Sequence, residues 1–321
     1  MTQRHLYWSS LEQYEICPRS FLWGHGHGTI DLGRGPGRSK AKPEKDSKHH
    51  AVMGIVLARA IEHLYNDELW REPEMLVQRI TDLVTREFTF ALNENYIDWA
   101  EAPSKQEMLD VCLKGALGYL KTMKANRLLG PYAKSEVDIT AWVDQYTPVG
   151  GRPDVIVRRE DTGITILDGK NSLTPGKYTN PDQLRWYALC FYLAYNTLPN
   201  RLAFVYFRYP EGTPPKDHPE GTPWTGLVGV PFTREDLKTL GVRAKETVRS
   251  LQKELFDPSP SAKACKFCDY KTVCDAAHQP TPRKPKSLPL VMEGTVEHTI
   301  TTSDGIVEFG FGAGVKGTTK P

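Results

Sequence analysis

The sequence predicts a mixed α/β fold in which helices pack on a central β-sheet. Helical apolar periodicity covers the ranges 51–70, 74–92 and 105–126. Runs rich in β-branched residues, typical of strands, follow at 134–143, 150–159 and 163–170. A further helix and strand come next. Helices, a three-stranded meander, a helix and then a strand are the order expected of a mixed sheet covered by helices.

The second half of the chain carries clear start signals for helices. Asn180 is a natural N-cap and Pro181 suits the first helical position, which predicts a helix to about Tyr195. "RLAFVYFRY" then indicates a buried strand and "TGLVGVPF" another. Thr233 and Asp236 resemble a capping box that opens a long polar helix.

The composition is that of a soluble globular protein. The 321 residues are 39% hydrophobic and 25% charged, enough for one large or two modest domains. No apolar run approaches the roughly 20 residues of a membrane span, and we recognise no signal peptide. Six cysteines in such a chain indicate a reducing compartment, so we expect a cytoplasmic protein without membrane contact. The net charge of +2 does not by itself indicate nucleic-acid binding.

Two domains are expected. Residues 1–280 form the main domain, with a mobile basic and Gly-rich insertion at 24–48. Residues 281–321 form a C-terminal segment. The Pro-rich basic linker "QPTPRKPKSLPL", residues 279–290, leads into it, and a tail or a small hairpin ends it.

The stretch "GRPDVIVRREDTGITILDGK" places acidic residues where a strand should bury valines. As a hairpin with its turn near Glu160–Gly163, it sets Asp154 opposite residue 168 or 169, about 5 Å away at Cβ. Asp168 and Lys170 share one face of their strand. Two such close carboxylates repel unless a cation lies between them, and their oxygens suit Mg²⁺ or Mn²⁺. The alternative is an exposed hairpin end with a surface salt bridge.

The cysteines divide into two groups. Cys112 and Cys190 lie in apolar helical runs and are predicted core residues. The others are candidates for a Cys₄ metal site, because a C-x2-C turn lets two thiolates face one metal: Cys17, Cys265, Cys268 and Cys274. Their spacing alone leaves zinc and iron–sulfur both open.

These elements together resemble the RecB-like nucleases of the PD-(D/E)xK superfamily, from about Leu11 to Cys274. The nearest resemblance is to members with a four-cysteine iron–sulfur cluster: the AddB nuclease domain, the CRISPR-associated RecB-like exonucleases and their phage relatives. The elements come in the family's order: Cys17 followed by Pro18, a Gly-led helix from Gly54, "GRPD", "LDGK", "QLRWY" and the last three cysteines.

The resemblance implies a restriction-endonuclease-like core with Asp154 and Asp168 as metal ligands and Lys170 as the catalytic lysine. Gln183 and Tyr187 match a Q-x3-Y motif on one helical face that contacts DNA; alternatively, Tyr187 is a core residue. The four cysteines then imply a [4Fe–4S] cluster rather than zinc, joining the N- and C-terminal regions.

One position departs from the family's pattern. A metal-binding histidine usually stands four residues after the glycine of the first helix, where this chain has Ala58. Glu62, one turn later on the same face, is a candidate substitute, and His63 is a poorer one because it points about 100° away.

The leading functional hypothesis is a Mg²⁺- or Mn²⁺-dependent DNA exonuclease acting on single-stranded ends, in the cytoplasm of a bacterial or phage-infected cell. Arg152 and Arg185 would hold flanking phosphates, while Trp186 and Tyr187 stack on bases. Expected partners are a helicase, a recombinase or CRISPR adaptation proteins. Two alternatives stay open: a non-cleaving subunit that binds DNA ends as a scaffold, and a zinc-stabilised binding protein with no nuclease ancestry.

Overall fold

The structure is a computed structural model whose chain forms two compact units, 1–273 and 274–321. It describes residues 5–25, 49–95, 97, 99, 102–172, 179–266, 268, 270, 271, 274–278, 296–301 and 307–311. Most of the predicted insertion at 24–48, and most of the predicted linker and tail at 281–321, lie outside these residues. Within the second unit, the described elements are the 3-10 helix η2 (Asp275–His278) and the antiparallel hairpin of β9 (Val296–Thr301) and β10 (Val307–Phe311).

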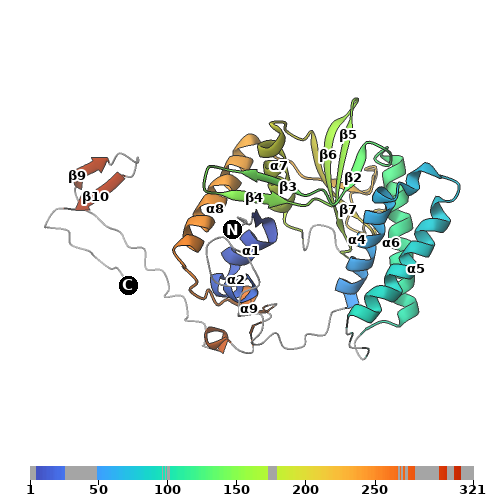
Figure 1. Ribbon diagram of the computed structural model, residues 1–321, viewed down its shortest axis with the longest axis horizontal. Helices are drawn as coiled ribbons and strands as arrows, with labels where there is room; N and C mark the ends of the chain where they lie inside the picture. Colours follow the sequence, from blue (N-terminus) through green and yellow to red (C-terminus); the bar gives the residue numbers. More distant parts are fainter. Residues whose placement is uncertain are drawn as a thin grey trace. The chain divides into compact units, whose positions relative to one another are not determined.

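The first unit contains a five-stranded sheet in the order β2-β5-β6-β7-β8 (Figure 1). Its strands are β2 (Ala133–Ser135), β5 (Val155–Arg159), β6 (Gly163–Lys170), β7 (Arg201–Tyr206) and β8 (Leu227–Gly229). Neighbours pair antiparallel except β6 and β7, which are parallel. The crossover between those two is helix α7 (Pro181–Tyr195). The prediction of a mixed sheet flanked by helices is confirmed.

A second sheet has three strands in the order β1-β4-β3, namely β1 (Leu6–Tyr7), β4 (Pro148–Gly151) and β3 (Ile139–Trp142). The expectation that 134–143 and 150–159 are two continuous strands of a meander was wrong, because each divides between the sheets. Glu136 has φ of 51° and turns the chain between β2 and β3. Pro153, which lacks an N–H, lies between β4 and β5.

Helices cover both faces of the five-stranded sheet. On one face lie α4 (His49–Asn66), α5 (Leu76–Glu94) and α6 (Lys105–Ala125), with the short η1 (Leu69–Arg71). On the other face lie α7 and α8 (Arg234–Gln252). The remaining helices of this unit are α1 (Trp8–Ile16), α2 (Pro18–His25) and α9 (Ala262–Lys266). None of the helices in the described part of the chain is long and apolar enough to cross a membrane.

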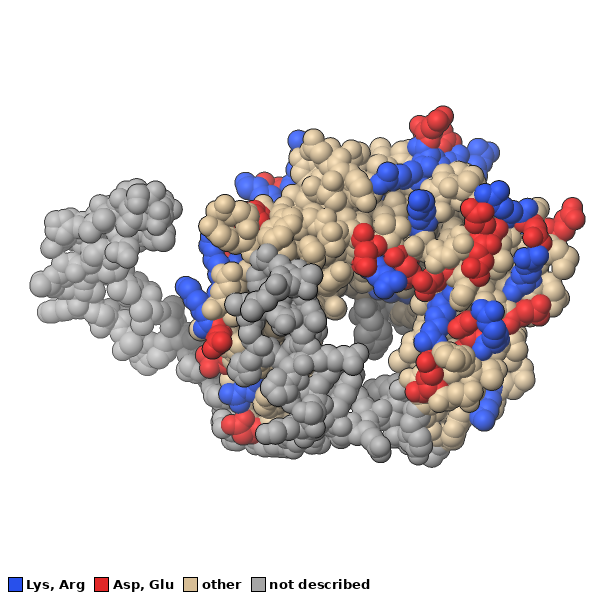
Figure 2. Space-filling view, viewed as in Figure 1, with Lys and Arg blue, Asp and Glu red and all other residues tan. Residues whose placement is uncertain are grey.

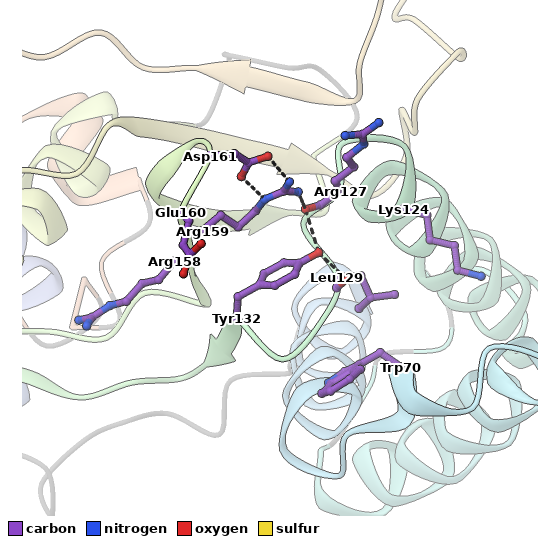
Figure 3. Close-up of a pocket in the computed structure, with 9 residues that line it drawn as sticks. All are labelled: Trp70, Lys124, Arg127, Leu129, Tyr132, Arg158, Arg159, Glu160 and Asp161. Atoms are coloured by element: carbon purple, nitrogen blue, oxygen red, sulfur yellow. Dashed lines mark hydrogen bonds and ion pairs between the residues drawn. The ribbon is translucent and has the colours of Figure 1, made fainter.

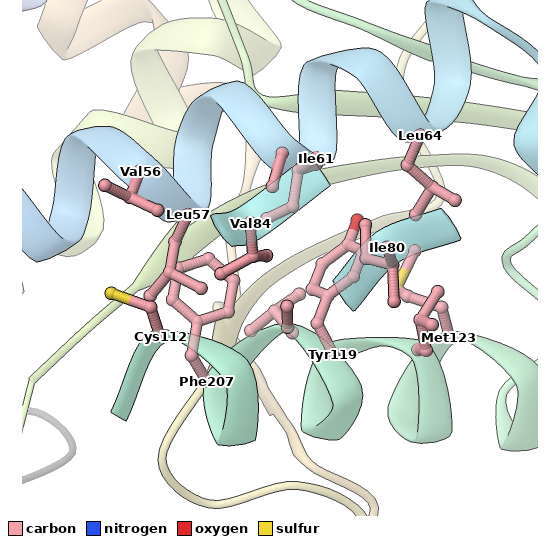
Figure 4. Packing of buried hydrophobic residues seen from close by; sticks show 14 of the residues in the cluster. Val56, Leu57, Ile61, Leu64, Ile80, Val84, Cys112, Tyr119, Met123 and Phe207 are labelled. Carbon is pink, nitrogen blue, oxygen red and sulfur yellow. The ribbon is translucent and has the colours of Figure 1, made fainter. Parts of the chain in front are cut away.

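Alternation along the strands divides the core into two clusters. Val155 and Val157 pack toward α4, α5 and α6, where Leu57, Ile61, Tyr119 and Met123 also lie (Figure 4). Ile156, between those two valines, packs instead toward α7 and α8. Both sheet faces are buried, which explains why the strands read as nearly continuous apolar runs. Cys112 belongs to the first cluster and Cys190 to the second, so their prediction as core residues is confirmed.

The predicted helix starts are confirmed. The Asn180 side chain accepts a hydrogen bond from the Asp182 N–H at 3.1 Å, and Pro181 opens α7. Thr233 and Asp236 form the reciprocal capping box of α8. Two ion pairs then join helices: Arg243 of α8 contacts Glu15 of α1 at 2.6 Å and Asp182 of α7 at 2.7 Å. The first turn of α7 is therefore fixed from both sides.

Gly169 in β6 occupies a position with no room for a side chain. A Cβ atom placed there would lie 2.3 Å from the Phe207 ring and 3.2 Å from Oδ2 of Asp154. Phe207 belongs to the core cluster under α4 and α6, so it has little freedom to move. The glycine of "LDGK" is thus required by packing.

We predict that Gly169→Ala destabilises the protein by about 1–3 kcal/mol, the usual range for overpacking a filled core. Thermal unfolding should then begin at lower temperature. Gly229→Ala in β8 is the matched control, because nothing lies within 4 Å of its Cβ position. Equal unfolding temperatures for the two variants would contradict this account of Gly169.

Candidate active site

The β5–β6 ladder brings Asp154 beside Asp168. Val155 pairs with Leu167, so the next position outward sets Asp154 opposite Asp168. Oδ2 of Asp154 accepts a hydrogen bond of 2.6 Å from the N–H of Gly169. The predicted hairpin pairing is confirmed, and two carboxylates lie together at the end of the ladder.

Both carboxylates carry raised pKa values. Asp168 is 3% exposed, and its burial raises the pKa of its carboxyl group. The pKa of Asp154 lies well above its usual range, first because of burial and second because of the negative charge of Asp168. The folded chain therefore holds these two groups in an environment that favours a proton or a cation next to them.

Lys170 and Gln183 surround the Asp168 carboxylate. The Lys170 ammonium lies 2.5 Å from Oδ2 of Asp168. The Gln183 amide accepts a hydrogen bond of 2.9 Å from Lys170 through Oε1, and its Nε2 donates to Oδ1 of Asp168 at 3.0 Å. The same Nε2 lies 3.0 Å from the Tyr187 hydroxyl oxygen, to which it donates. Gln183 thus holds the acid and the lysine in fixed positions.

The aromatic residues of α7 are buried. Trp186 is completely inaccessible and donates its indole N–H to the carbonyl of Gly150 at 2.8 Å. The expectation that Trp186 stacks on bases was wrong, because its ring packs in the core. Tyr187 is 8% exposed, and burial raises the pKa of its hydroxyl. Contact between Tyr187 and DNA stays a prediction.

The two arginines expected to hold phosphates differ in their surroundings. Arg152 is half exposed and pairs with Glu136, with Nε 2.8 Å from Oε2. More of the hydrogen-bond donors of Arg185 are used within the protein. Its guanidinium donates to the carbonyl of Pro231 and pairs with Asp182 at 3.0 Å. Arg152 is therefore the freer of the two to meet a substrate.

Glu136 is an acidic residue near the site that the motifs did not indicate. Its N–H donates to the carbonyl of Asp154 at 3.1 Å, and its backbone is in the strained left-handed region. Burial raises the pKa of its carboxyl group, and the negative charges of Glu62 and Asp168 raise it further, against the lowering effect of Arg152. Glu136 sits in a turn between strands of different sheets, which sequence periodicity does not reveal.

Helix α4 carries the two candidate substitutes for the expected histidine, Glu62 and His63. The Glu62 carbonyl accepts a hydrogen bond of 3.2 Å from Ser135, next to Glu136. Ala58, one turn earlier, is exposed and has no atom able to bind a metal. His63 is paired with Asp67, with Nδ1 2.9 Å from Oδ2. Of the two candidate substitutes, Glu62 is the one whose charge reaches the acidic site.

The donor atoms suit a hard divalent ion. Within the described ranges, no three His, Cys, Asp or Glu side chains come close enough to enclose a metal by themselves. Mg²⁺ does not need such a cage, since it keeps several waters and binds through one or two carboxylates plus substrate phosphate. Buried and mutually repelling, Asp154 and Asp168 fit that requirement.

Three of the predicted cluster cysteines lie in the first unit and are half-buried. Cys17 follows α1, where its N–H donates to the carbonyl of Gln13 at 3.0 Å. Cys265 lies in α9, and its carbonyl accepts from the N–H of Cys268 at 3.4 Å. The Cys268 thiol lies 3.8 Å from the hydroxyl of Ser20 in α2. Cys274 is the first residue of the second unit.

Comparisons with known proteins identify the family. A sequence model of the PD-(D/E)XK nuclease superfamily matches residues 6–275. The comparison with curated proteins found no match. Among solved structures, the crystal structure of SSO0001 is 16% identical, covering 75% of this chain and 91% of that chain, with a TM-score of 0.33. That similarity is too distant to carry a conclusion. The family match covers most of the chain, and the chain belongs to the PD-(D/E)XK nuclease superfamily.

Proposed function

We propose that the protein is a Mg²⁺- or Mn²⁺-dependent DNA exonuclease that acts on single-stranded ends. The observation that carries the proposal is the grouping of Asp154, Asp168 and Lys170 at the end of the β5–β6 ladder. Membership of a nuclease superfamily supports phosphodiester hydrolysis as the reaction. Recombination, repair or CRISPR adaptation is the proposed setting, with a helicase, a recombinase or adaptation proteins as partners.

Each side chain has a distinct role in the proposed reaction. Asp154 and Asp168 would hold the metal, with Glu62 as a further candidate, and Gln183 keeps Asp168 and Lys170 in place. The Lys170 ammonium positions the attacking water and stabilises negative charge on the phosphate. Arg152 and Arg185 would contact phosphates that flank the cleaved bond. Gln183 and Tyr187, the Q-x3-Y pair, would contact the DNA strand near the metal. A bound Mg²⁺ or Mn²⁺ would supply a Lewis acid that polarises the phosphate.

A second candidate function is a non-cleaving subunit that binds DNA ends. The observation that favours it is Ala58, which stands where a metal-binding histidine is expected. Retention of both aspartates and the lysine favours the nuclease. The third reading, a zinc-stabilised protein with no nuclease ancestry, is wrong because the chain belongs to a nuclease superfamily.

We also propose that Cys17, Cys265, Cys268 and Cys274 hold a [4Fe–4S] cluster. The support is their spacing in the sequence, together with the approach of the Cys268 region to the N-terminal helices. Trp23 of α2 meets Tyr270 edge-on, with ring centroids 5.4 Å apart. Cys274 is assigned from spacing alone.

Removal of the Asp168 charge should abolish cleavage. We expect anaerobically purified protein with Mn²⁺ or Mg²⁺ to shorten end-labelled single-stranded DNA, and Asp168→Asn to lower the rate at least about 10²-fold. Asp161→Asn, an exposed carboxylate on the same hairpin, is the matched control and should cleave normally. Activity that appears only in Ala58→His would show a site lacking one ligand. Inactivity of all these proteins would favour the non-cleaving subunit.

The repulsion at the site should be visible in the stability of the metal-free protein. The pKa of the Asp154 carboxyl group is higher in the folded chain than in the unfolded chain. The folded state therefore loses stability as the pH rises from the unfolded pKa to the folded pKa, and mild acidification restores that stability. We expect Asp154→Asn to raise the unfolding temperature in EDTA at pH 7, by roughly 2–4 °C per kcal/mol. Mn²⁺ should stabilise the wild type more than the variant. A variant that unfolds earlier in EDTA would contradict the electrostatic account.

The cysteine proposal predicts a coloured protein. Anaerobic preparations should absorb near 400 nm and contain iron and sulfide, and Cys268→Ser should lose both. Cys112→Ser is the control, since Cys112 is buried in the core between helices. A colourless protein that retains zinc would overturn the iron–sulfur assignment.

A further inference from the structure

A groove with two basic side chains lies at the β2 edge of the five-stranded sheet. It has a volume of about 440 Å³. Strands β2 and β5 form one wall and the end of α7 forms another. The residues that line the groove include Tyr132, Lys134, Val137, Ile156, Arg158 and Tyr195.

The groove and the active site lie on the same face of the sheet. Alternate residues of a strand point the same way, so Arg158 shares a face with Ile156. Ile156 pairs with Ile166 of β6, and Asp168 lies two residues further along that strand on the same face. Lys134 pairs with Ile156 in the β2–β5 ladder and lies on that face too. Val137 lines the groove and follows Glu136 directly. At about 3.3 Å per residue, Arg158 lies roughly 13 Å along the strand from Asp154.

The two cations of the groove are not neutralised by the protein. In the described part of the chain, neither Lys134 nor Arg158 pairs with a carboxylate. The Arg158 guanidinium instead lies over two rings of α7, 5.2 Å from the centre of Phe191 and 5.0 Å from that of Tyr195. Aromatic contacts hold an arginine in place without consuming its charge. Arg158 is therefore a positioned cation with hydrogen-bond donors left for an anion.

A larger neighbouring cavity, of about 850 Å³, has a different character. It surrounds the end of the β5–β6 hairpin, and Glu160 and Asp161 line it together with Lys124 and Arg127 (Figure 3). Tyr132 and Arg158 line both this cavity and the groove. Arg159 there is already paired with Asp161 and donates to the carbonyl of Arg127 at 2.5 Å. Figure 3 shows Arg158 pointing away from these residues. Carboxylates thus accompany the cations of the larger cavity, whereas the described residues that line the groove include no Asp or Glu.

The described residues on the face shown in Figure 2 form no broad basic patch. The net charge is +2, and basic and acidic side chains are interspersed over the helical layer shown in Figure 2. Attraction of a polyanion must then come from locally placed cations. Lys134 and Arg158 supply such cations in the groove.

We propose that this groove binds the single DNA strand whose end is cut, with Lys134 and Arg158 on two of its phosphates. The inference rests on the proposed function, since it assigns the path of that substrate. A strand with unstacked bases suits a narrow groove that combines cations with aromatic rings. Tyr195 is 46% exposed and offers such a ring at the groove's far end. The distance of roughly 13 Å from Arg158 to Asp154 sets the binding site a few nucleotides from the cleaved bond.

The experiment is a binding titration in EDTA, where no metal supports cleavage, so its outcome does not depend on the proposed function. Anisotropy of a labelled 20-nucleotide oligothymidine would be followed at several salt concentrations. Loss of two single-strand phosphate contacts should reduce the salt slope of log K by about 1.4, with affinity falling about tenfold or more. Two double variants test the groove. The first combines Lys134→Ala with Arg158→Ala. The second combines Lys134→Ala with Arg158→Gln, which retains most of the side-chain volume at position 158.

The matched control is Lys124→Ala with Arg127→Ala, which removes two cations from the larger cavity. The proposal expects the control to bind as the wild type does, and both groove variants to bind weakly while unfolding at an unchanged temperature. Equal binding by wild type and groove variants would overturn it, as would a larger loss in the control. Duplex DNA bound as tightly as the single strand, and weakened equally, would overturn the assignment to a single strand. If the wild type binds the strand through the groove but does not cleave it with Mg²⁺ or Mn²⁺, the proposed nuclease function is wrong and the groove assignment stands.

Discussion

Repulsion between the buried carboxylates of Asp154 and Asp168 is the constraint around which the site is built. The β5–β6 register forces them together, and burial raises the pKa of both groups. The Gly169 N–H, the Lys170 ammonium and the Gln183 amide each offset part of the cost. A fold optimised for stability alone would replace such a pair by apolar residues. The cation and phosphate of the proposed function would offset this repulsion, which is the usual exchange of stability for function.

The start of α7 decides how well the site is ordered. Asn180 and Pro181 fix where the helix begins, and Gln183 follows within its first turn, facing Asp168 and Lys170. Arg243 then joins that turn to α1 through Asp182 and Glu15. Because α7 is the crossover between the parallel strands β6 and β7, its N-terminal turn lies beside the end of β6. Local capping, sheet topology and ion pairs between helices therefore converge on the same few atoms.

The sequence allowed the hairpin register, the α7 cap and the two buried cysteines to be predicted, because each depends on short-range patterns: alternation, N-cap chemistry and apolar periodicity. It did not allow Glu136 to be found, since that residue owes its position to a strained turn between two sheets. The same turn broke an apparently continuous strand. The prediction for Trp186 was wrong because the sequence around an aromatic residue beside a motif does not show whether its ring faces solvent or the core. Helix rotation relative to the sheet, which decides that choice, is set by tertiary packing.

Alternation along the strands separates the core residues from the polar residues, since the two groups point to opposite faces of the sheet. Val155, Val157 and Leu167 face the helical layer and hold the sheet to α4, α5 and α6. Their neighbours face the other way, where Asp168 meets Gln183 of α7 and Arg158 reaches the groove. The backbone fixes the distance between the Arg158 cation and the Asp168 carboxylate on this face of the sheet. A DNA strand bound at Arg158 would then place one of its phosphodiester bonds at the carboxylates, at a fixed distance from the bound phosphate. Changing that spacing would require a bulge in β5, which would at the same time turn its core valines away from the helices.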